Sequence, residues 1–169
     1  LLKIDYEIIL AEDGSKDDTK NILLELISND KNKIYVNNIV EKKRGYGGAI
    51  ISSVKIANGE FILYADSDGQ CNPKDFINFW NKKELINEGI IIGNRKTRSD
   101  TLFRLIMSKS FKIIHRILFY SKVKDPSCPY VLCKKKTFLE IEKYLIYMSE
   151  GFGWGVVAAC IKTKKNILE

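Results

Sequence analysis

The sequence predicts an α/β protein with a mostly parallel sheet and helices on both faces. Three observations lead to this fold class. Short apolar runs of strand length alternate with longer segments of helical periodicity. The run 90–92 is apolar throughout, as in strands that are buried on both sides. The chain has 169 residues, which is enough for one domain with a sizeable core.

The first half of the chain contains three of the expected strands and two of the helices. Thr19 caps the first helix, and Gly59 terminates the second. The first helix has an apolar face made of Ile22, Leu23, Leu26 and Ile27. The expected elements are strands at 6–10, 34–36 and 61–65, and helices at about 19–27 and 49–58.

The second half continues the alternation of strands and helices. Pro73 begins a helix that reaches about residue 87 and buries Phe76, Phe79, Trp80 and Leu85. The elements expected after it are a strand at 90–92, a long helix at 101–120, a rigid loop at 125–130 with a short strand after it, a helix from about 136, and a last helix at 153–165. The chain stops at Glu169 in what looks like a further strand.

Composition limits the range of functions. The formal charge of +7 favours anionic partners, but the basic residues are dispersed and no nucleic-acid motif is present, so nucleic acid is excluded. No run approaches the length of a membrane span and no signal peptide is visible. The four cysteines are scattered with no Cys-x-x-Cys pair, which favours a cytosolic setting. His115 lies in an apolar helical pattern, where a packed residue is expected. Reduced thiols are expected at Cys71, Cys128, Cys133 and Cys160.

Asp66 and Asp68 directly follow the apolar run 61–65. Residues two apart in an extended chain point to the same side, so the two carboxylates face one point. Adjacent carboxylates repel each other, and a divalent cation such as Mg²⁺ or Mn²⁺ removes that repulsion. Ligands of open α/β sheets bind beyond the carboxyl ends of the strands. The pattern therefore indicates a metal site with positions left for phosphate oxygens, while a solvated turn remains the alternative.

Two loops contribute further polar groups. Glu12, Asp13 and Ser15 follow the first strand, and three cations at 42–44 precede the glycine-rich segment 45–48. Backbone amides in a glycine-rich turn before a helix, with cations beside them, suit a diphosphate. A flexible basic loop is the alternative, because neither named phosphate-loop pattern is present.

The long helix at 101–120 is both apolar and basic. Arg104, Lys112 and Arg116 share one stripe, and most of its aliphatic side chains lie elsewhere. A cationic stripe beside apolar side chains is typical of helices at a membrane surface. The alternative is a core helix whose basic side is solvated.

Four motifs in this order resemble glycosyltransferase family 2, and the likeness covers nearly the whole chain. They are Glu-Asp-Gly-Ser-x-Asp-x-Thr at 12–19, Gly-Tyr-Gly-Gly-Ala-Ile at 45–50, the segment 59–70 with its acidic pair, and Gly-Asn-Arg at 93–95. The branch that it resembles is the dolichyl-phosphate mannosyltransferase and polyprenyl-phosphate glycosyltransferase group. The resemblance implies the GT-A nucleotide-sugar-binding fold and inverting, metal-dependent sugar transfer.

The resemblance also implies how the chain relates to a whole protein. We expect residues 1–169 to be a single glycosyltransferase catalytic domain, truncated at both ends. The N-terminal strand of the sheet, which in this fold lies between the strands at 6–10 and 61–65, would precede Leu1.

Roles follow from the resemblance residue by residue. It places nucleotide-sugar binding on Glu12, Asp13, Ser15, Arg44, Gly45, Gly47 and Asp66, metal binding on Asp66 and Asp68, catalysis on Asp66, Asp68, Arg95 and Asp125, and acceptor binding on Arg98, Arg104 and Ser108. Three departures stand out. Glu12 replaces the commoner Asp, Pro129 and Tyr130 replace Gly-Phe, and the acidic residue of the last helix is missing from 154–159.

We therefore expect transfer from a UDP- or GDP-sugar to a polyprenyl phosphate at the cytoplasmic face of a membrane. A phosphate monoester is already largely anionic at neutral pH and needs no general base, whereas a sugar hydroxyl usually needs one. One alternative is a family 2 enzyme of glycan synthesis that uses Asp125 or Glu150 as the base. The other is a non-catalytic module that binds a sugar nucleotide or an anionic lipid.

Overall fold

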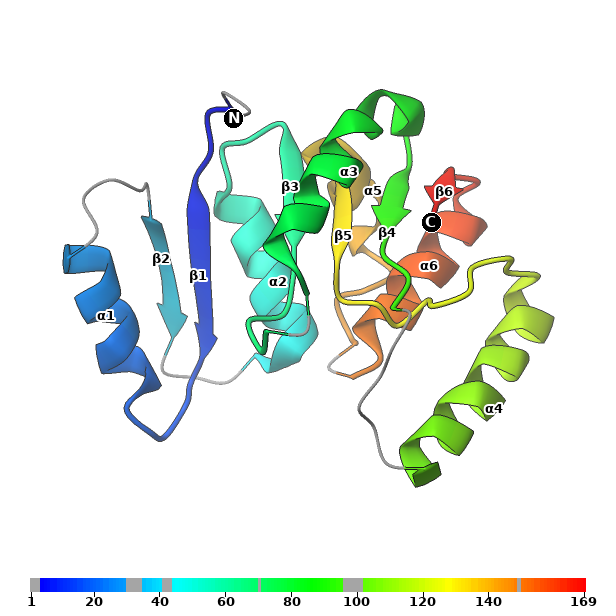
Figure 1. The fold of residues 1–169 in the computed structure, drawn as a ribbon, viewed down its shortest axis with the longest axis horizontal. Coiled ribbons are helices and arrows are strands. Elements are labelled where there is room, and N and C mark those ends of the chain that lie inside the picture. The colour runs from blue at the N-terminus through cyan, green and yellow to red at the C-terminus, as the bar shows by residue number, and fades with distance from the viewer. Residues whose placement is uncertain (1–3, 30–34, 41–43, 70, 96–101, 149) are drawn as a thin grey trace.

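The computed structural model describes residues 4–29, 35–40, 44–69, 71–95, 102–148 and 150–169. Its strands form two sheets (Figure 1). In the first sheet, β1 (Ile8–Asp13) pairs in parallel with β2 (Tyr35–Val40). The second sheet has the spatial order β3 (Phe61–Tyr64), β5 (Val131–Lys134), β4 (Ile90–Ile92) and β6 (Ile167–Leu168). Since β1 and β3 do not pair within the described part of the chain, a further strand between them stays a prediction.

The prediction of a mostly parallel sheet is wrong, because the second sheet is mixed. β5 runs antiparallel to both β3 and β4, and only β6 is parallel to its neighbour. The reason lies in the connection from β4 to β5. The Gly93 amide donates to the Tyr130 carbonyl, and the Arg95 side chain binds Asp125. The end of β4 and the approach to β5 therefore lie at one edge, and β5 must run back.

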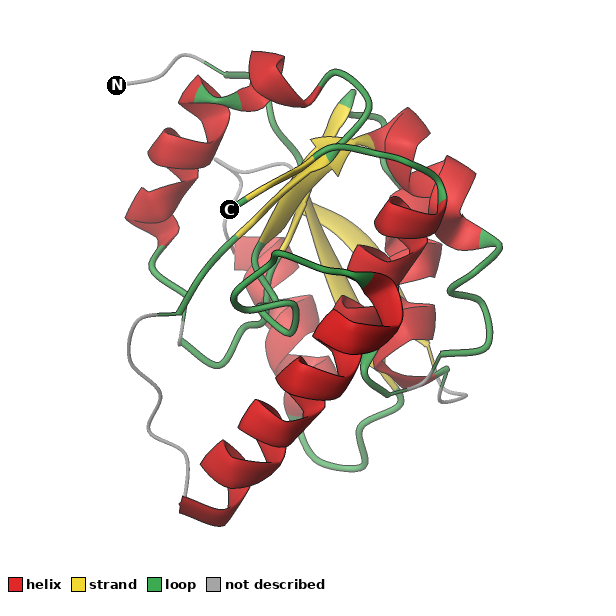
Figure 2. Ribbon diagram, turned by 90° about the vertical axis from the view of Figure 1, so that its right-hand side faces the viewer, coloured by secondary structure: helices red, strands yellow, loops and turns green. Residues whose placement is uncertain are grey.

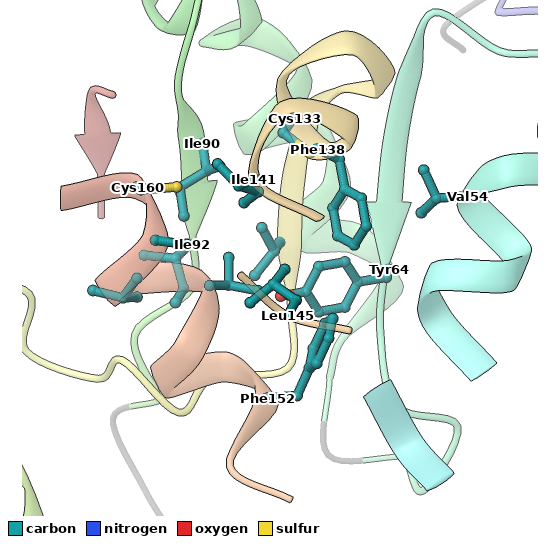
Figure 3. Packing of buried hydrophobic residues seen from close by; sticks show 14 of the residues in the cluster. Val54, Tyr64, Ile90, Ile92, Cys133, Phe138, Ile141, Leu145, Phe152 and Cys160 are labelled. Atoms are coloured by element: carbon teal, nitrogen blue, oxygen red, sulfur yellow. The ribbon is translucent and has the colours of Figure 1, made fainter. Parts of the chain in front are cut away.

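Helices pack on both faces of the second sheet, as expected. Side chains alternate along a strand, so Ile90 and Ile92 join one apolar cluster while Ile91 joins another. The larger cluster is formed with α2 (Gly45–Ile56), α5 (Lys135–Glu142) and α6 (Phe152–Lys162), and Figure 3 shows Tyr64, Phe138 and Phe152 within it. The smaller cluster includes Ile86 from the opposite face.

The β1–β2 sheet is packed much less tightly. α1 (Thr19–Asn29) follows β1 and contains no buried residue. Ile22 and Leu26, which the sequence places on an apolar face, are exposed to water, whereas Leu23 and Ile27 are half-buried. The fully buried apolar side chains of the described residues all lie at position 49 or later.

The helix expected at 73–87 is broken. α3 covers only Phe76–Asn81, with 3₁₀ turns at Pro73–Asp75 and Lys83–Ile86 on either side. The break at Lys82 changes the helical phase, so Ile86 is fully buried while Leu85, expected in the core, is exposed. α2 differs too, because it begins at Gly45 and includes the glycine-rich segment in its first turn.

α4 (Leu102–Phe119) lies at one side of the molecule and projects beyond the sheet (Figures 1 and 2). It packs on α6 through His115, which is buried and stacks on Trp154 with ring centroids 5.3 Å apart. The packed role predicted for His115 is confirmed, and so are the four reduced cysteines. No helix of the described residues is long and apolar enough to cross a membrane.

Candidate functional site

Asp66 and Asp68 lie just beyond the carboxyl end of β3. The last residue of that strand, Tyr64, is buried, whereas Asp66 is half-buried and Asp68 is exposed. Gly69 follows with a φ of +79°, a conformation that favours glycine, and turns the chain away. The strand thus emerges from the core at the point where the two carboxylates begin.

Asp66 is hydrogen-bonded to the first turn of α2. The Tyr46 hydroxyl donates to Asp66 Oδ1 over 2.8 Å. The Tyr46 ring meets Phe152 edge-on, with centroids 6.0 Å apart. Burial, the hydrogen bond to Asp66 and the charge of that carboxylate raise the pKa of Tyr46 well above its ordinary value, so the hydroxyl remains a donor. No sequence signal identified this contact.

Arg95 is held in place by Asp125 and Ser127. Its Nε donates to Asp125 Oδ2 over 2.8 Å, and its Nη2 donates to Asp125 Oδ1 over 3.1 Å and to Ser127 Oγ over 2.8 Å. Burial by itself would raise the pKa of Asp125, but the hydrogen bonds and charge of Arg95 outweigh it and hold that pKa below its usual range. Asp125 is therefore an ionised, buried carboxylate that fixes a guanidinium.

Arg95 follows β4 at the sheet edge from which the acidic pair emerges. Tyr64 and Ile92, the last residues of β3 and β4, both pair with Val131, so these strands end at the same edge, one on each side of β5. Burial and then the charges of Asp66 and Asp68 raise the pKa of the Cys71 thiol, while Arg95 lowers it. A joint action of Asp66, Asp68 and Arg95 on one ligand stays a prediction.

The acidic pair suits a hard divalent cation, because both side chains offer carboxylate oxygens. Within the described residues, no group of three or more His, Cys, Asp or Glu side chains is arranged to hold a metal. From the described residues, Asp66 and Asp68 would be the ligands, and a nucleotide diphosphate would supply further oxygens. This donor set fits Mg²⁺ or Mn²⁺, and metal binding stays a prediction.

The loop after β1 is connected to the start of α2. Asp13 accepts hydrogen bonds from the amides of Arg44 (2.6 Å) and Gly45 (2.7 Å), which caps α2 from outside the helix. Arg44 donates to Ser52 Oγ and to the Glu12 carbonyl. Asp13 and Arg44 therefore join the end of β1 to α2, and their contacts with a nucleotide sugar stay a prediction.

The Glu12 carboxylate faces its own loop. It is buried and accepts hydrogen bonds from the amides of Gly14 and Ser15. Hydrogen bonds from Ser15, its side chain first, hold the pKa of Glu12 below its usual range. Glu12 fixes the backbone that presents Asp13 and Ser15, while the nucleotide contact predicted for Glu12 is not tested.

Gly47 is needed for packing. A Cβ atom at this position would lie 2.2 Å from the Met148 carbonyl oxygen and 2.6 Å from Phe152 Cδ2. The glycine thus allows α2 to approach the segment before α6. The sequence predicts a phosphate-binding turn at this glycine. Its packing contact was not foreseen, because a contact with residues distant in the sequence leaves no pattern in the neighbouring residues.

The residues predicted to bind the acceptor are only partly described. Arg98 lies outside the described residues, as do Lys42, Lys43 and the side chain of Arg104. Ser108 is half-buried on α4. Lys112, from the basic stripe, points toward the site, with its Nζ 4.0 Å from Asp125 Oδ1.

An open groove of about 770 Å³ lies at the other end of β3. It is lined by Gly59, Glu60 and the lysines 134–136 among others. Lys134 lies 3.4 Å from Glu60, and Lys135 donates to the Ala57 carbonyl, so these two cations already have partners. Because Gly59 and Glu60 precede β3 while Asp66 follows it, this groove is separate from the acidic pair.

The fold and its acidic edge can now be compared with known proteins. Residues 1–142 match the family model described as Glycosyl transferase family 2. This match covers most of the chain, so the chain belongs to glycosyltransferase family 2. The resemblance drawn from the four motifs is confirmed.

The curated relatives narrow the branch of the family. A protein of Dictyostelium discoideum named dolichyl-phosphate beta-glucosyltransferase is 30% identical over 146 residues, which are 80% of this chain and 45% of the relative. A protein of the same name from Drosophila melanogaster is 28% identical over 175 residues, which are 86% of this chain and 52% of the relative. The chain spans about half the length of these relatives.

A solved structure supports the fold. The glucosyl-3-phosphoglycerate synthase of Mycobacterium tuberculosis, solved with uridine diphosphate, superposes with a TM-score of 0.52 at 15% identity. The match covers 80% of this chain and 53% of that protein. At this identity the likeness concerns the fold alone, which is an α/β fold with a mixed sheet.

Proposed function

We propose that this glycosyltransferase moves a sugar from a nucleotide sugar to a polyprenyl phosphate, with inversion at the anomeric carbon. The observation on which the proposal rests is the Asp66–Asp68 pair at the end of β3, with a fixed Arg95 near it. The names of the similar proteins support glucose as the sugar and a dolichyl-type phosphate as the acceptor. UDP-glucose is therefore the first donor to test, and GDP-sugars are the alternative.

In this proposal, each charged group near the end of β3 acts on the donor diphosphate. Asp66 and Asp68 hold the Mg²⁺ or Mn²⁺ ion, which neutralises the diphosphate and stabilises the leaving group. Arg95 adds positive charge nearby, and its planar guanidinium suits phosphate oxygens. Because Asp125 and Ser127 already orient Arg95, little conformational freedom is lost when the donor binds.

The state of Asp125 favours a phosphate acceptor. A general base must take up a proton, but Asp125 is buried and both of its carboxylate oxygens accept hydrogen bonds from Arg95. Protonation would break this pair, so Asp125 is better suited to positioning Arg95 than to acting as a base. A polyprenyl phosphate needs no base. An acceptor hydroxyl would need another one, such as the exposed Glu150.

The outer face of α4 supports a location at a membrane surface. Among the described side chains of this helix, seven large apolar ones are each more than half exposed: Phe103, Ile106, Met107, Ile113, Ile114, Ile117 and Leu118. The exposed cations Lys109 and Arg116 are on the same helix, and the chain has a net charge of +7. The exposure of these apolar side chains favours the membrane surface over a core helix whose basic side is solvated. We propose that this outer face enters an anionic lipid surface.

Flotation with anionic liposomes tests the role of α4. Ile113→Glu with Ile117→Glu in the full-length chain should abolish flotation, because charges would then enter the apolar face. The matched control is Ile22→Glu with Leu26→Glu, which adds the same charges to exposed positions of α1 and should leave flotation unchanged. Equal flotation of the two double variants would contradict the membrane location.

Transfer itself is tested by an acceptor comparison. The full-length chain is incubated with labelled UDP-glucose, Mn²⁺ and either polyprenyl phosphate or the corresponding polyprenol. We expect labelled lipid from the phosphate alone, because the alcohol would require a base. If GDP-mannose replaces UDP-glucose as the better donor, the acceptor result still stands. Transfer to polyprenol, or only to a soluble glycan, would contradict the proposal.

A further inference from the structure

Tyr46 connects the first turn of α2 to the acidic pair. Its hydroxyl donates to Asp66 Oδ1 over 2.8 Å, across twenty positions of sequence. We propose that Tyr46 is a positioning residue, which holds the Asp66 carboxylate in the orientation that a metal-bound nucleotide requires. This inference rests on the proposed function, because it assigns a partner to one of the proposed metal ligands.

The backbone at Tyr46 is fixed on both sides. Before it, Asp13 accepts hydrogen bonds from the amides of Arg44 and Gly45. After it, Gly47 lies so close to the Met148 carbonyl and to Phe152 that no side chain fits there. The first turn of α2 therefore has little freedom to move, and the position of the Tyr46 ring follows from it.

The ring of Tyr46 is supported by the core. It meets Phe152 edge-on, with centroids 6.0 Å apart and planes at 79°, and Phe152 is almost fully buried. Aromatic pairs of this geometry attract each other through the ring edge and face. The hydroxyl thus reaches Asp66 from a side chain whose other end is anchored.

The exposure of the bond argues for a functional role. Tyr46 is 41% exposed, and its hydrogen bond to Asp66 lies at the protein surface. Such a bond adds little to folding stability, because water replaces it in the unfolded chain. Partners that orient metal ligands, in contrast, typically change metal affinity by about 10–100-fold when they are removed.

Tyr46→Phe in the full-length chain tests the inference, because it removes only the hydroxyl. Calorimetry measures UDP binding with Mn²⁺ and with a chelator, and the ratio of the two affinities is the metal-linked enhancement. We expect Tyr46→Phe to lower this enhancement about tenfold or more, while the melting temperature and the metal-free affinity stay unchanged. GDP is titrated in parallel.

Tyr64→Phe is the matched control. Tyr64 belongs to the same aromatic cluster, and its buried hydroxyl has no hydrogen-bond partner within the described residues. Its removal should leave the enhancement unchanged. In an Asp66→Asn background, Tyr46→Phe should cause no further loss, because its target carboxylate is gone.

The outcomes separate this inference from the proposed function. A wild-type chain without Mn²⁺-linked binding of UDP or GDP would overturn both. Wild-type enhancement that Tyr46→Phe leaves unchanged, or increases, would overturn the role of Tyr46 alone. The role of Tyr46 would also be overturned if Tyr46→Phe lowered the enhancement by the same factor in the Asp66→Asn background as in the wild type.

Discussion

Two carboxylate sites of opposite character lie at one edge of the sheet. Asp66 and Asp68 follow β3 on the side open to water, whereas Asp125 is 1% exposed and paired with Arg95 at both oxygens. A buried carboxylate that is fully engaged by a guanidinium stabilises the fold and orients its partner. A carboxylate at an exposed strand end contributes little to folding and is accessible to a ligand. The exposed carboxylates are therefore suited to binding a ligand, and the buried carboxylate is suited to orienting Arg95.

Removing a charge from the exposed pair should have the largest effect on activity. Asp68→Asn keeps the shape of the side chain but weakens metal binding. Turnover of the full-length enzyme should fall about a thousandfold, because a catalytic metal contributes several kcal/mol and about 1.4 kcal/mol corresponds to tenfold. The melting temperature should not change, because Asp68 is exposed. Wild-type turnover in excess chelator would contradict the metal role.

Asp125→Asn should mainly affect stability. Breaking a buried ion pair by removing one partner costs about 3–5 kcal/mol, so the free energy of unfolding in urea should fall by that amount. Glu60→Gln is the control, because Glu60 pairs with Lys134 at 3.4 Å but its side chain is 72% exposed. That variant should lose at most about 1 kcal/mol. Equal losses of unfolding free energy in Asp125→Asn and Glu60→Gln would contradict the claim that the buried carboxylate stabilises the fold more than the exposed one.

Lowering the pH should reduce the folding stability that the Asp125–Arg95 pair contributes, by less than the substitution of Asp125 does. Arg95 holds the pKa of Asp125 below its usual value, so the folded state favours the ionised form. The stability from this pair is complete above the unfolded pKa of about 4 and is lost as pH falls through the lower folded pKa. Unfolding measured from pH 5 downward should therefore show a steeper loss for the wild type than for Asp125→Asn. Parallel curves would show that another group dominates the acid response.

The positions of the strands and helices could be predicted from the sequence better than the relative directions of the strands. Apolar runs placed β3 and β4 within one residue, and helical periodicity located α4 nearly to its ends. The direction of β5 was missed because it depends on long-range pairing, in which Val131 lies beside Ile92 and Tyr64. A local pattern does not contain a contact of that range, so a helical connection was interpreted as a parallel crossover.

The site was predictable where adjacent residues define it. The two-residue period of an extended chain predicts that Asp66 and Asp68 face one point, and their place just beyond β3 agrees with the apolar run before them. The role of Gly47 was not predictable, because the need for a glycine comes from the Met148 carbonyl, which lies far away in the sequence. Periodicity also showed that α4 has two faces, but not that Lys112 would turn toward Asp125 and the aliphatic face toward water.

The most direct test of the account compares the two carboxylate sites in one binding experiment. UDP affinity is measured with Mn²⁺ and with chelator for the full-length wild type, Asp68→Asn and Asp125→Asn, at a temperature where all three are folded. We expect Mn²⁺-linked enhancement in the wild type and in Asp125→Asn, and none in Asp68→Asn. Enhancement that survives Asp68→Asn, or that is lost in folded Asp125→Asn, would contradict the assignment of metal binding to the exposed pair.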